Sequence, residues 1–494
     1  MPYTLTEKTG INPHDVQHWN SVLIAVYGAS LLAFSPICGW FADHTTTRRL
    51  PLLLGLVALA GSTVMLNIGT SIGILIAGRL LQGASAAVVW VVGLALLVDT
   101  VGQTDVGQSM GYVSMAMSLA ILIAPLLGGV VLDHGGYNAV FAMAYAIIGL
   151  DIILRLVLVE KKVARRWEPP EEVADLGASS GGAGYGATTS ERPATPAYPT
   201  DGCDDEEKKS SDITAAPHQT HTSDPEKALP AHNTNNASTP FTTPAPSLTP
   251  HPSSRYRLPP TLSLLTSRRL ITSLWATLTI SILTSALDAV LPLFVRTTFA
   301  WSSTGAGLIF LPLVLPSFLA PLFGALADRG HLSPRYPTAL GFLAACPCWV
   351  LLRFVDHNSL GQKAVLCVLL SGMGVCMAAV MPCIMAEITY VVAEKERRRP
   401  GVFGRMGAYA QAYGLFNGAW AAGALVGPIW AGYVRDGAGW GTMAWSLGVL
   451  AAVSAVPVGL WCGGWVFGKG SGRGRGGREG EANEERGSHG EKRD

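Results

Sequence analysis

The sequence predicts an all-α membrane protein built from two bundles of apolar helices, and three observations support this class. Of the 494 residues, 49% are hydrophobic and only 14% are charged, which is more apolar sequence than a soluble core of this length needs. Long stretches contain no Asp, Glu, Lys or Arg, whereas residues 160–269 and 469–494 hold most of the charge. A short pattern of glycine, acid and arginine occurs once in each half. The net charge of +1 does not indicate nucleic-acid binding.

The repeated pattern follows an apolar stretch in each half of the chain. It consists of Gly39 and Asp43 followed by Arg48 and Arg49 in the first half, and of Gly324 and Asp328 followed by Arg329 in the second. Glycine allows two helices to approach closely, and arginines after an apolar helix favour the cytoplasmic side of a membrane. One copy would be equally consistent with any short basic loop. Two copies indicate two related halves.

Five apolar stretches in the first half are long enough to cross about 30 Å of hydrocarbon at 1.5 Å per residue. They cover residues 21–41, 50–68, 72–98, 108–132 and 137–159. We therefore expect a bundle of five spans over residues 20–160. Residues 1–19 lack the apolar core of a signal peptide, and we expect them to form a non-cytoplasmic N-terminal segment.

Residues 161–269 are rich in Pro, Ser, Thr and Gly and show no apolar periodicity. Such a composition cannot bury enough apolar surface to fold, so it predicts a disordered linker. Both ends of the linker are basic, which places it on the cytoplasmic side.

Six further spans are predicted in the second half. They cover residues 270–295, 305–327, 336–354, 364–392, 406–434 and 440–467. We expect them to form a bundle over residues 270–468, followed by a disordered cytoplasmic tail over residues 469–494. In this half one full span precedes the span that ends in the repeat, and in the first half none does. The comparison predicts that the chain lacks a first helix and that its N-terminus lies opposite the cytoplasm.

Two further motifs lie inside apolar stretches. One is Arg79-Leu-Leu-Gln82-Gly83, and the other is Ala120-Ile-Leu-Ile-Ala124-Pro125-Leu-Leu-Gly128-Gly129, which is echoed as Gly423-Ala-Leu-Val-Gly427-Pro428-Ile-Trp-Ala-Gly432. Together with the repeated loop pattern, these motifs resemble those of the major facilitator superfamily, specifically the drug and amine proton antiporters, in a fungal branch similar to vesicular amine transporters. The sequence departs from that pattern at His44, Thr46, Ala120 and Ala124.

The resemblance implies a monomeric carrier of two bundles, related by a pseudo-twofold axis along the membrane normal, with its substrate site at the midplane and alternating access. It assigns the conformational motifs to Gly39, Asp43, Arg48, Gln82, Gly83, Pro125, Gly128, Gly129, Asp328, Arg329, Gly427 and Pro428. Small residues four apart let helix backbones touch in a bilayer. We therefore expect the Pro125 and Pro428 motifs to form a tight interface between the halves, although ordinary helix packing explains the spacing equally well.

Charged residues inside the apolar stretches are the candidates for proton coupling. The resemblance implies such a role for Arg79. The alternative interpretation is that the Arg79 side chain extends towards the membrane surface. Asp151 and Arg155 lie four apart and can neutralise each other. Asp288 and Glu387 have no partner three or four residues away, so each can carry a proton or meet a cationic amine. The alternative is that each pairs with an arginine of another helix.

The candidate substrate-lining residues are Tyr112, Tyr413, Asn417 and Trp420. Aromatic rings of this kind can hold a lipophilic cation, although in membrane helices they more often pack or lie at the interface. Asn417 stands where the resemblance to amine transporters leads us to expect an acid.

The remaining patterns exclude other classes. The cysteines lie mostly in apolar stretches, so we expect no disulfide framework and no metal site. No phosphate-binding loop and no nucleophile cluster occurs, so we expect neither a cofactor nor an enzyme. The predicted function is secondary transport in the plasma membrane or a vacuolar or vesicular membrane, by proton-coupled antiport or efflux of a small lipophilic or cationic organic compound. Its partners are the lipid bilayer, protons and the substrate. The alternative is a truncated or transport-inactive carrier-derived protein, either a sensor or a gene-model fragment.

Overall fold

The computed structural model describes residue 9 and residues 15–45, 47–158, 259–301, 303–329, 333–403 and 407–464. Within these ranges the chain forms helices and turns and no strand, which confirms the all-α class. Residues 161–258 of the predicted linker and the tail over 469–494 lie outside the described residues, as does nearly all of the segment before residue 15.

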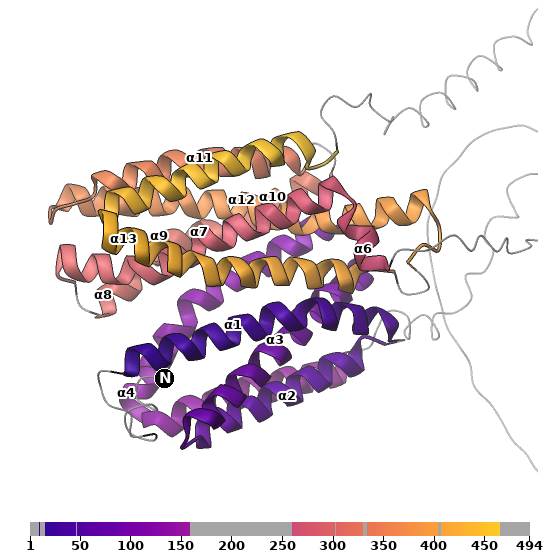
Figure 1. Ribbon diagram of the computed structural model, residues 1–494, viewed down its shortest axis with the longest axis horizontal. Coiled ribbons are helices and arrows are strands. Elements are labelled where there is room, and N and C mark those ends of the chain that lie inside the picture. The colour runs from indigo at the N-terminus through magenta and orange to yellow at the C-terminus, as the bar shows by residue number, and fades with distance from the viewer. Residues whose placement is uncertain are drawn as a thin grey trace, which may run out of the picture. The chain divides into compact units, whose positions relative to one another are not determined.

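The first half forms a bundle of long helices (Figure 1). These are α1 (Val16–His44), α2 (Arg49–Ile68), α3 (Ile72–Val101) and α4 (Val106–Val157). The last of them changes direction at Gly136, which has φ 73°, a value that only glycine adopts without strain. The two arms of α4 correspond to the predicted spans over 108–132 and 137–159.

The second half contains longer and shorter helices. They are α6 (Pro260–Leu265), α7 (Arg268–Phe299), α8 (Ser303–Leu308), α9 (Leu311–Val314), the 3₁₀ helices η2 (Leu315–Leu319) and η3 (Leu352–Phe354), α10 (Ala320–Asp328), α11 (Arg335–Leu351), α12 (Leu360–Arg398) and α13 (Tyr409–Trp461). The structure differs from the prediction at α6, which lies in the stretch assigned to the linker. Leucines and a proline at its first helical position favour this short helix.

The predicted span over residues 305–327 is broken into pieces rather than one helix. Prolines Pro312, Pro316 and Pro321 stand at the starts of α9, η2 and α10. Each proline lacks a backbone N–H and clashes with the preceding turn, so the regular hydrogen-bond ladder is interrupted at each one.

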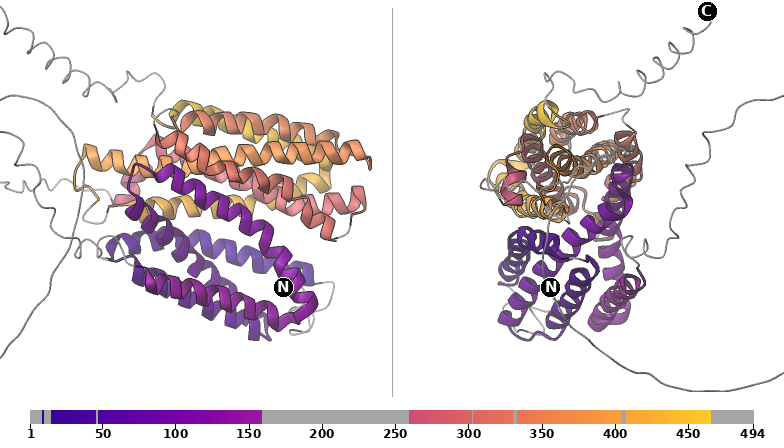
Figure 2. Two further views of the ribbon diagram at one scale, coloured as in Figure 1. Left: turned by 180° about the vertical axis from the view of Figure 1, so that it is seen from behind. Right: turned by 90° about the vertical axis from the view of Figure 1, so that its right-hand side faces the viewer.

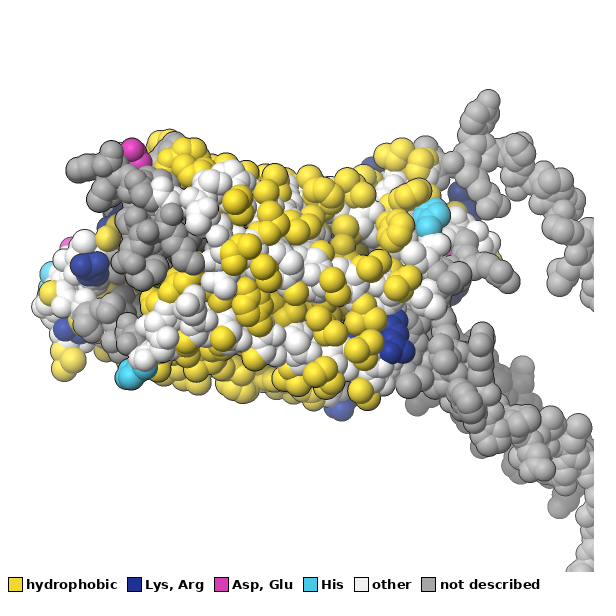
Figure 3. Space-filling model, turned by 90° about the horizontal axis from the view of Figure 1, so that it is seen from below, with side chains coloured by type: hydrophobic (Ala, Val, Ile, Leu, Met, Phe, Trp, Pro, Cys, Tyr) yellow, Lys and Arg dark blue, Asp and Glu magenta, His cyan; other side chains and the backbone are white. Residues whose placement is uncertain are grey.

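Ten helical segments in the described part of the chain are long and apolar enough to cross a membrane. The last of these, Tyr409–Trp461, bends at Gly439 into two arms that match the predicted spans over 406–434 and 440–467. Figure 3 shows hydrophobic side chains over the middle of one face and Lys and Arg side chains towards its ends. Leu54, Phe318 and Val368 are among the apolar side chains that are more than half exposed. Such a surface suits contact with lipid.

The two bundles meet along two lines of contact, which Figure 2 shows from two further sides. Helix α1 of the first half packs against α13 of the second, and α4 of the first half packs against α10 and α12 of the second. We call the contact of α1 with α13 near Asp43 the α1–α13 seam, and that of α4 with α10 near Asp328 the α4–α10 seam.

Candidate functional site

A central cavity of about 250 Å³ lies between the two halves. Helices α1, α3 and α4 contribute one side of its wall, and α13 contributes the other. Its aromatic and polar lining residues are Tyr27, Trp90, Phe416, Asn417 and Trp420. A cavity that is bounded by both halves changes shape whenever the halves move relative to each other.

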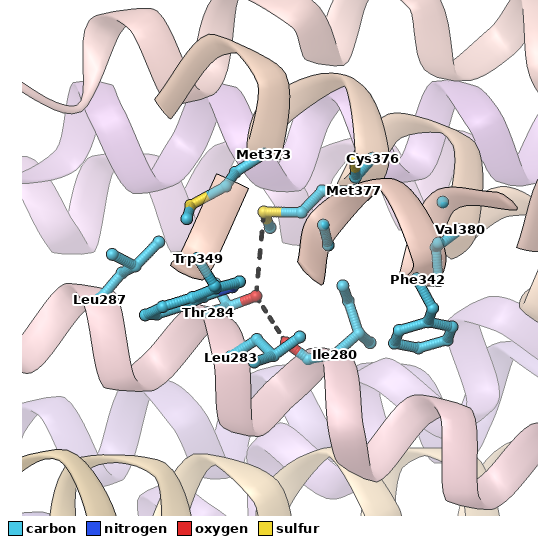
Figure 4. Close-up of a pocket in the computed structure, with 12 residues that line it drawn as sticks. Ile280, Leu283, Thr284, Leu287, Phe342, Trp349, Met373, Cys376, Met377 and Val380 are labelled. Carbon is cyan, nitrogen blue, oxygen red and sulfur yellow. Dashed lines mark hydrogen bonds between the residues drawn. The ribbon is translucent and has the colours of Figure 1, made fainter. Parts of the chain in front are cut away.

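Two smaller cavities adjoin the second half. One of about 30 Å³ shares Met117 and Trp420 with the central cavity and extends to Thr284 of α7. The other, of about 20 Å³, lies inside the second bundle and is shown in Figure 4. There the Thr284 hydroxyl donates to the Ile280 carbonyl at 2.7 Å and lies 4.0 Å from the Met377 sulfur. Each has room for little more than a water molecule, so the central cavity is the candidate substrate site.

The predicted lining residues separate into two groups. Asn417 and Trp420 line the central cavity, and the Asn417 Nδ2 donates to Ser35 Oγ at 2.8 Å across the two halves. Tyr413 is completely buried, and its hydroxyl donates to the Met385 carbonyl at 3.0 Å. Tyr112 is 52% exposed and lines none of the three cavities described above. The sequence did not identify Tyr27 as a lining residue, because its position on the cavity wall depends on how α1 packs against α3.

At one end of the central cavity, each half provides a carboxylate that caps a helix of the other half. Asp43 accepts hydrogen bonds from the backbone N–H groups of Ala410 at 3.2 Å and Gln411 at 2.8 Å. Asp328 accepts from the N–H groups of Gly107 at 2.7 Å and Gln108 at 2.8 Å. The first N–H groups of a helix have no partner within it and carry partial positive charge, so a carboxylate satisfies them well. The repeated acids therefore hold the two halves together.

Glycines on both sides of each seam permit this contact. A Cβ atom at Gly39 would lie 2.5 Å from the Ala410 carbonyl oxygen, and one at Gly414 would lie 2.6 Å from the Ser35 carbonyl oxygen. On the other side, Gly324 packs directly against the backbone of Gly107. Any side chain at these positions would separate the helices and pull the caps from their N–H partners.

The surroundings of the two caps differ. Asp43 also accepts from Arg48 Nη2 at 2.9 Å, and Arg48 Nε donates to Asp99 at 3.1 Å. Both Arg48 and Asp43 side chains are 2% exposed. Asp328 accepts instead from the Tyr390 hydroxyl at 2.5 Å, while Arg329 is exposed. Sequence reasoning missed Asp99 and Tyr390, because neither belongs to the repeated pattern.

The Arg79 motif lies where α3 packs against α1. Arg79 Nη1 donates to Gln82 Oε1 at 2.8 Å. Gly83 faces the backbone of α1, where a Cβ would lie 2.5 Å from the Tyr27 carbonyl oxygen. The motif thus packs Gly83 against Tyr27, which lines the central cavity, with Arg79 one helical turn away on the same face of α3.

The two candidate acids lie in different surroundings. Glu387 is completely buried, and its Oε1 accepts from Arg269 Nε at 2.8 Å and from the Gly463 N–H at 2.7 Å. Glu387 therefore pairs with an arginine of another helix, which is the alternative that the sequence left open. Asp288 is exposed on α7, one helical turn beyond Thr284, and no hydrogen bond or ion pair joins it to the described part of the chain. The predicted pair of Asp151 and Arg155 is present at 3.3 Å.

The Pro125 and Pro428 motifs do not form the tight interface between halves that their spacing led us to expect. A Cβ at Gly128 or Gly129 would meet nothing within 4 Å. Gly423 and Gly427 do pack closely, but against α7 of their own half, where the Gly423 Cβ would lie 2.6 Å from the Leu278 carbonyl oxygen. The spacing specified close helix packing and could not specify which helix is the partner.

Comparison with known proteins agrees with this architecture. A family model described as Major Facilitator Superfamily matches residues 1–409. The chain is similar to an uncharacterized MFS-type transporter, C18.02, of Schizosaccharomyces pombe, with 30% identity over 88% of this chain and 84% of that protein. It is also similar to the MFS-type transporter ppzB of Metarhizium rileyi, with 28% identity over 95% of this chain and 91% of that protein. The solved structure of the human organic anion transporter MFSD10 (TETRAN) superposes with a TM-score of 0.56 at 16% identity, covering 89% of this chain and 83% of that one.

Proposed function

Because this chain belongs to the Major Facilitator Superfamily, we propose that it moves a small lipophilic organic compound across a membrane by alternating access, in exchange for protons. The family and the fold are those of secondary transporters rather than enzymes, and the protein is an integral multi-pass membrane protein. The observation that carries the proposal is the central cavity between the halves, with both carboxylate caps at one end of it.

The caps support a conformation that is closed at the end where they lie. Both seams lie beyond the same end of the cavity, because α1 and α13 run from the cavity to Asp43 and Gln411, and α4 runs from Met117 to Gly107. Arg48 and Arg329 follow the caps, and basic connections favour the cytoplasmic side. The conformation described here would therefore be closed to the cytoplasm. Opening it breaks the hydrogen bonds of both caps.

Asp288 is the acid that we assign to proton coupling. Asp288 is exposed on α7, one helical turn beyond Thr284, which lines the small cavity that adjoins the central one. Glu387 is less suited to this role because Arg269 already neutralises it. Arg79 is an additional coupling candidate.

The test uses the purified full chain in vesicles that contain a trapped pH-sensitive dye. Two permanently charged aromatic probes, 1-naphthalenesulfonate and trimethyl(1-naphthylmethyl)ammonium, are added outside, and proton movement is recorded. We expect at least one probe to move protons, and we expect Asp288→Asn to abolish this movement because it removes only the titratable group. Asp356→Asn, at an exposed carboxylate that pairs with His357 outside the cavities, is the matched control. Proton movement that survives Asp288→Asn, or its absence with both probes, contradicts the proposal.

A further inference from the structure

We propose that the substrate bound in the central cavity is an aromatic organic anion whose acidic group is held by Arg79 and the Tyr27 hydroxyl. This inference rests on the proposed transport function and specifies the charge of its substrate. Four observations carry it: the position of Arg79, its lack of a carboxylate partner, the composition of the cavity wall, and the pairing of the surrounding acids.

Arg79 lies on the face of α3 that packs against α1. It lies one turn from Gly83, whose face of α3 contacts the α1 backbone at Tyr27 and Leu31. Tyr27 and Leu31 both line the central cavity. Arg79 is therefore one helical turn from the point where α3 packs against the cavity wall.

Within the described ranges, the guanidinium of Arg79 has no carboxylate partner of the kind that such a group needs inside a membrane. Its one hydrogen bond in the described part of the chain goes to the neutral Gln82 of the same helix. Its Nε atom is buried and has no acceptor among the residues that the structure describes. By contrast, Arg48, Arg155 and Arg269 in or beside the spans each have a carboxylate. An unpaired guanidinium in a membrane span is costly, and an anionic ligand would remove that cost.

The wall of the central cavity favours a flat ring system. Trp90, Phe416 and Trp420 present aromatic surface, and Asn417 and Tyr27 supply the polar groups. The volume of about 250 Å³ is just below the usual range of about 300–1,000 Å³ for ligand pockets, so a small ring system suits it. Aromatic rings alone would accept a cation as readily as a neutral ring.

The charges around the cavity decide between an anion and a cation. Among the residues recorded as lining it there is neither Asp nor Glu. Asp43 and Glu387 are neutralised by arginines. Asp288 lies on α7, and no residue of α7 lines the central cavity. A cation in the cavity would be repelled by Arg79 and would meet no carboxylate there. An anion would be attracted, and its oxygen atoms could accept from the Arg79 fork.

The experiment measures equilibrium binding of 1-naphthalenesulfonate and trimethyl(1-naphthylmethyl)ammonium to the full chain in vesicles of zwitterionic lipid, without a proton gradient. The two probes share one ring system and differ in charge. We expect the sulfonate to bind about tenfold more tightly, the effect of one charged hydrogen-bonded pair. Arg79→Gln should remove this preference, and Arg79→Lys should retain most of it. Arg353→Gln, at an exposed arginine of η3 that lies over Phe354, should leave it unchanged.

Three results would overturn the inference: equal or tighter binding of the ammonium probe, unchanged sulfonate affinity in Arg79→Gln, or binding of neither probe. Should Arg79→Gln fail to fold, Tyr27→Phe tests the same site by removing one hydroxyl, and unchanged sulfonate affinity there contradicts the proposal. Because binding is measured without a gradient, loss of proton coupling in Asp288→Asn does not affect this test, and a failure here leaves the transport function standing.

Discussion

Glu387 shows how a carboxylate that has no partner on its own helix becomes an anchor in the folded chain. Its Oε1 atom binds Arg269 at the start of α7 and the Gly463 N–H just after α13. Glu387 on α12 therefore ties the start of one helix to the end of another. Arg269 is 118 residues away in the sequence, so no local spacing rule could have paired the two. This geometry supports an anchoring role for Glu387 more than proton transfer.

Removing the cation from this pair should destabilise the protein strongly. We expect Arg269→Met to lower the free energy of unfolding by about 3–5 kcal/mol, because it leaves a buried carboxylate uncompensated. The double variant Arg269→Met with Glu387→Met should recover most of this loss, since it removes both charges. Chemical denaturation in mixed micelles measures the difference. If the single variant is as stable as the parent, the pair contributes nothing to folding.

At the scale of helices, close approach depends on which face a glycine presents. Gly39 and Gly324 face the opposite half, Gly427 faces its own half, and Gly128 faces open space. All four stand in motifs that the sequence singled out, yet only two of them lie in a seam. A motif identifies a position where packing can be tight, and the neighbouring helix decides whether it is.

Alanine substitutions should separate these glycines. Gly39→Ala places a Cβ 2.5 Å from the Ala410 carbonyl oxygen, and we expect a loss of about 1–3 kcal/mol as the seam is forced apart. Gly128→Ala, the matched control on α4, meets nothing within 4 Å and should be neutral or stabilising by up to about 1 kcal/mol, because alanine favours a helix. Denaturation of both variants measures this. Equal losses would mean that the close approach at Gly39 is unimportant.

The helices could be predicted from the sequence better than their partners could. Apolar length gave the spans, and the repeat of Gly39 and Asp43 at Gly324 and Asp328 gave two related halves. The superfamily resemblance is confirmed, whereas the amine-antiporter branch and the missing first helix stay predictions. The breaks in the span over 305–327 could have been found from its three prolines. The carboxylate caps could not have been predicted, because Asp43 binds backbone N–H groups, which no sequence pattern identifies.

At the scale of the whole molecule, the caps are reciprocal. The first half supplies Asp43 to α13, and the second half supplies Asp328 to α4. In neither half does the repeated acid cap the N-terminus of a helix of that same half. The two halves must therefore separate at both seams together when the closed end opens, which is what alternating access requires of a rigid pair of bundles.

Pinning one seam should stop this motion. Ser35→Cys with Asn417→Cys replaces a pair whose side chains are 2.8 Å apart across the α1–α13 contact, and a short thiol crosslinker there should abolish transport until it is cleaved. Thr279→Cys with Ser454→Cys replaces a pair 3.0 Å apart within the second half and should leave transport intact. Proteoliposome transport before and after crosslinker cleavage gives the comparison. Undiminished transport with the first pair crosslinked would rule out separation of this seam.

The distance along the chain between Asp43 and its partners bears on how the protein is made. The Ala410 N–H is 367 residues downstream of Asp43, so at about 5–20 residues per second a ribosome needs roughly 20–70 s to supply it. For most of that interval Asp99, which is only 51 residues from Arg48 and in the same half, is already available to pair with it. The nascent first half thus carries its own countercharge for this arginine well before the seam that buries it can form.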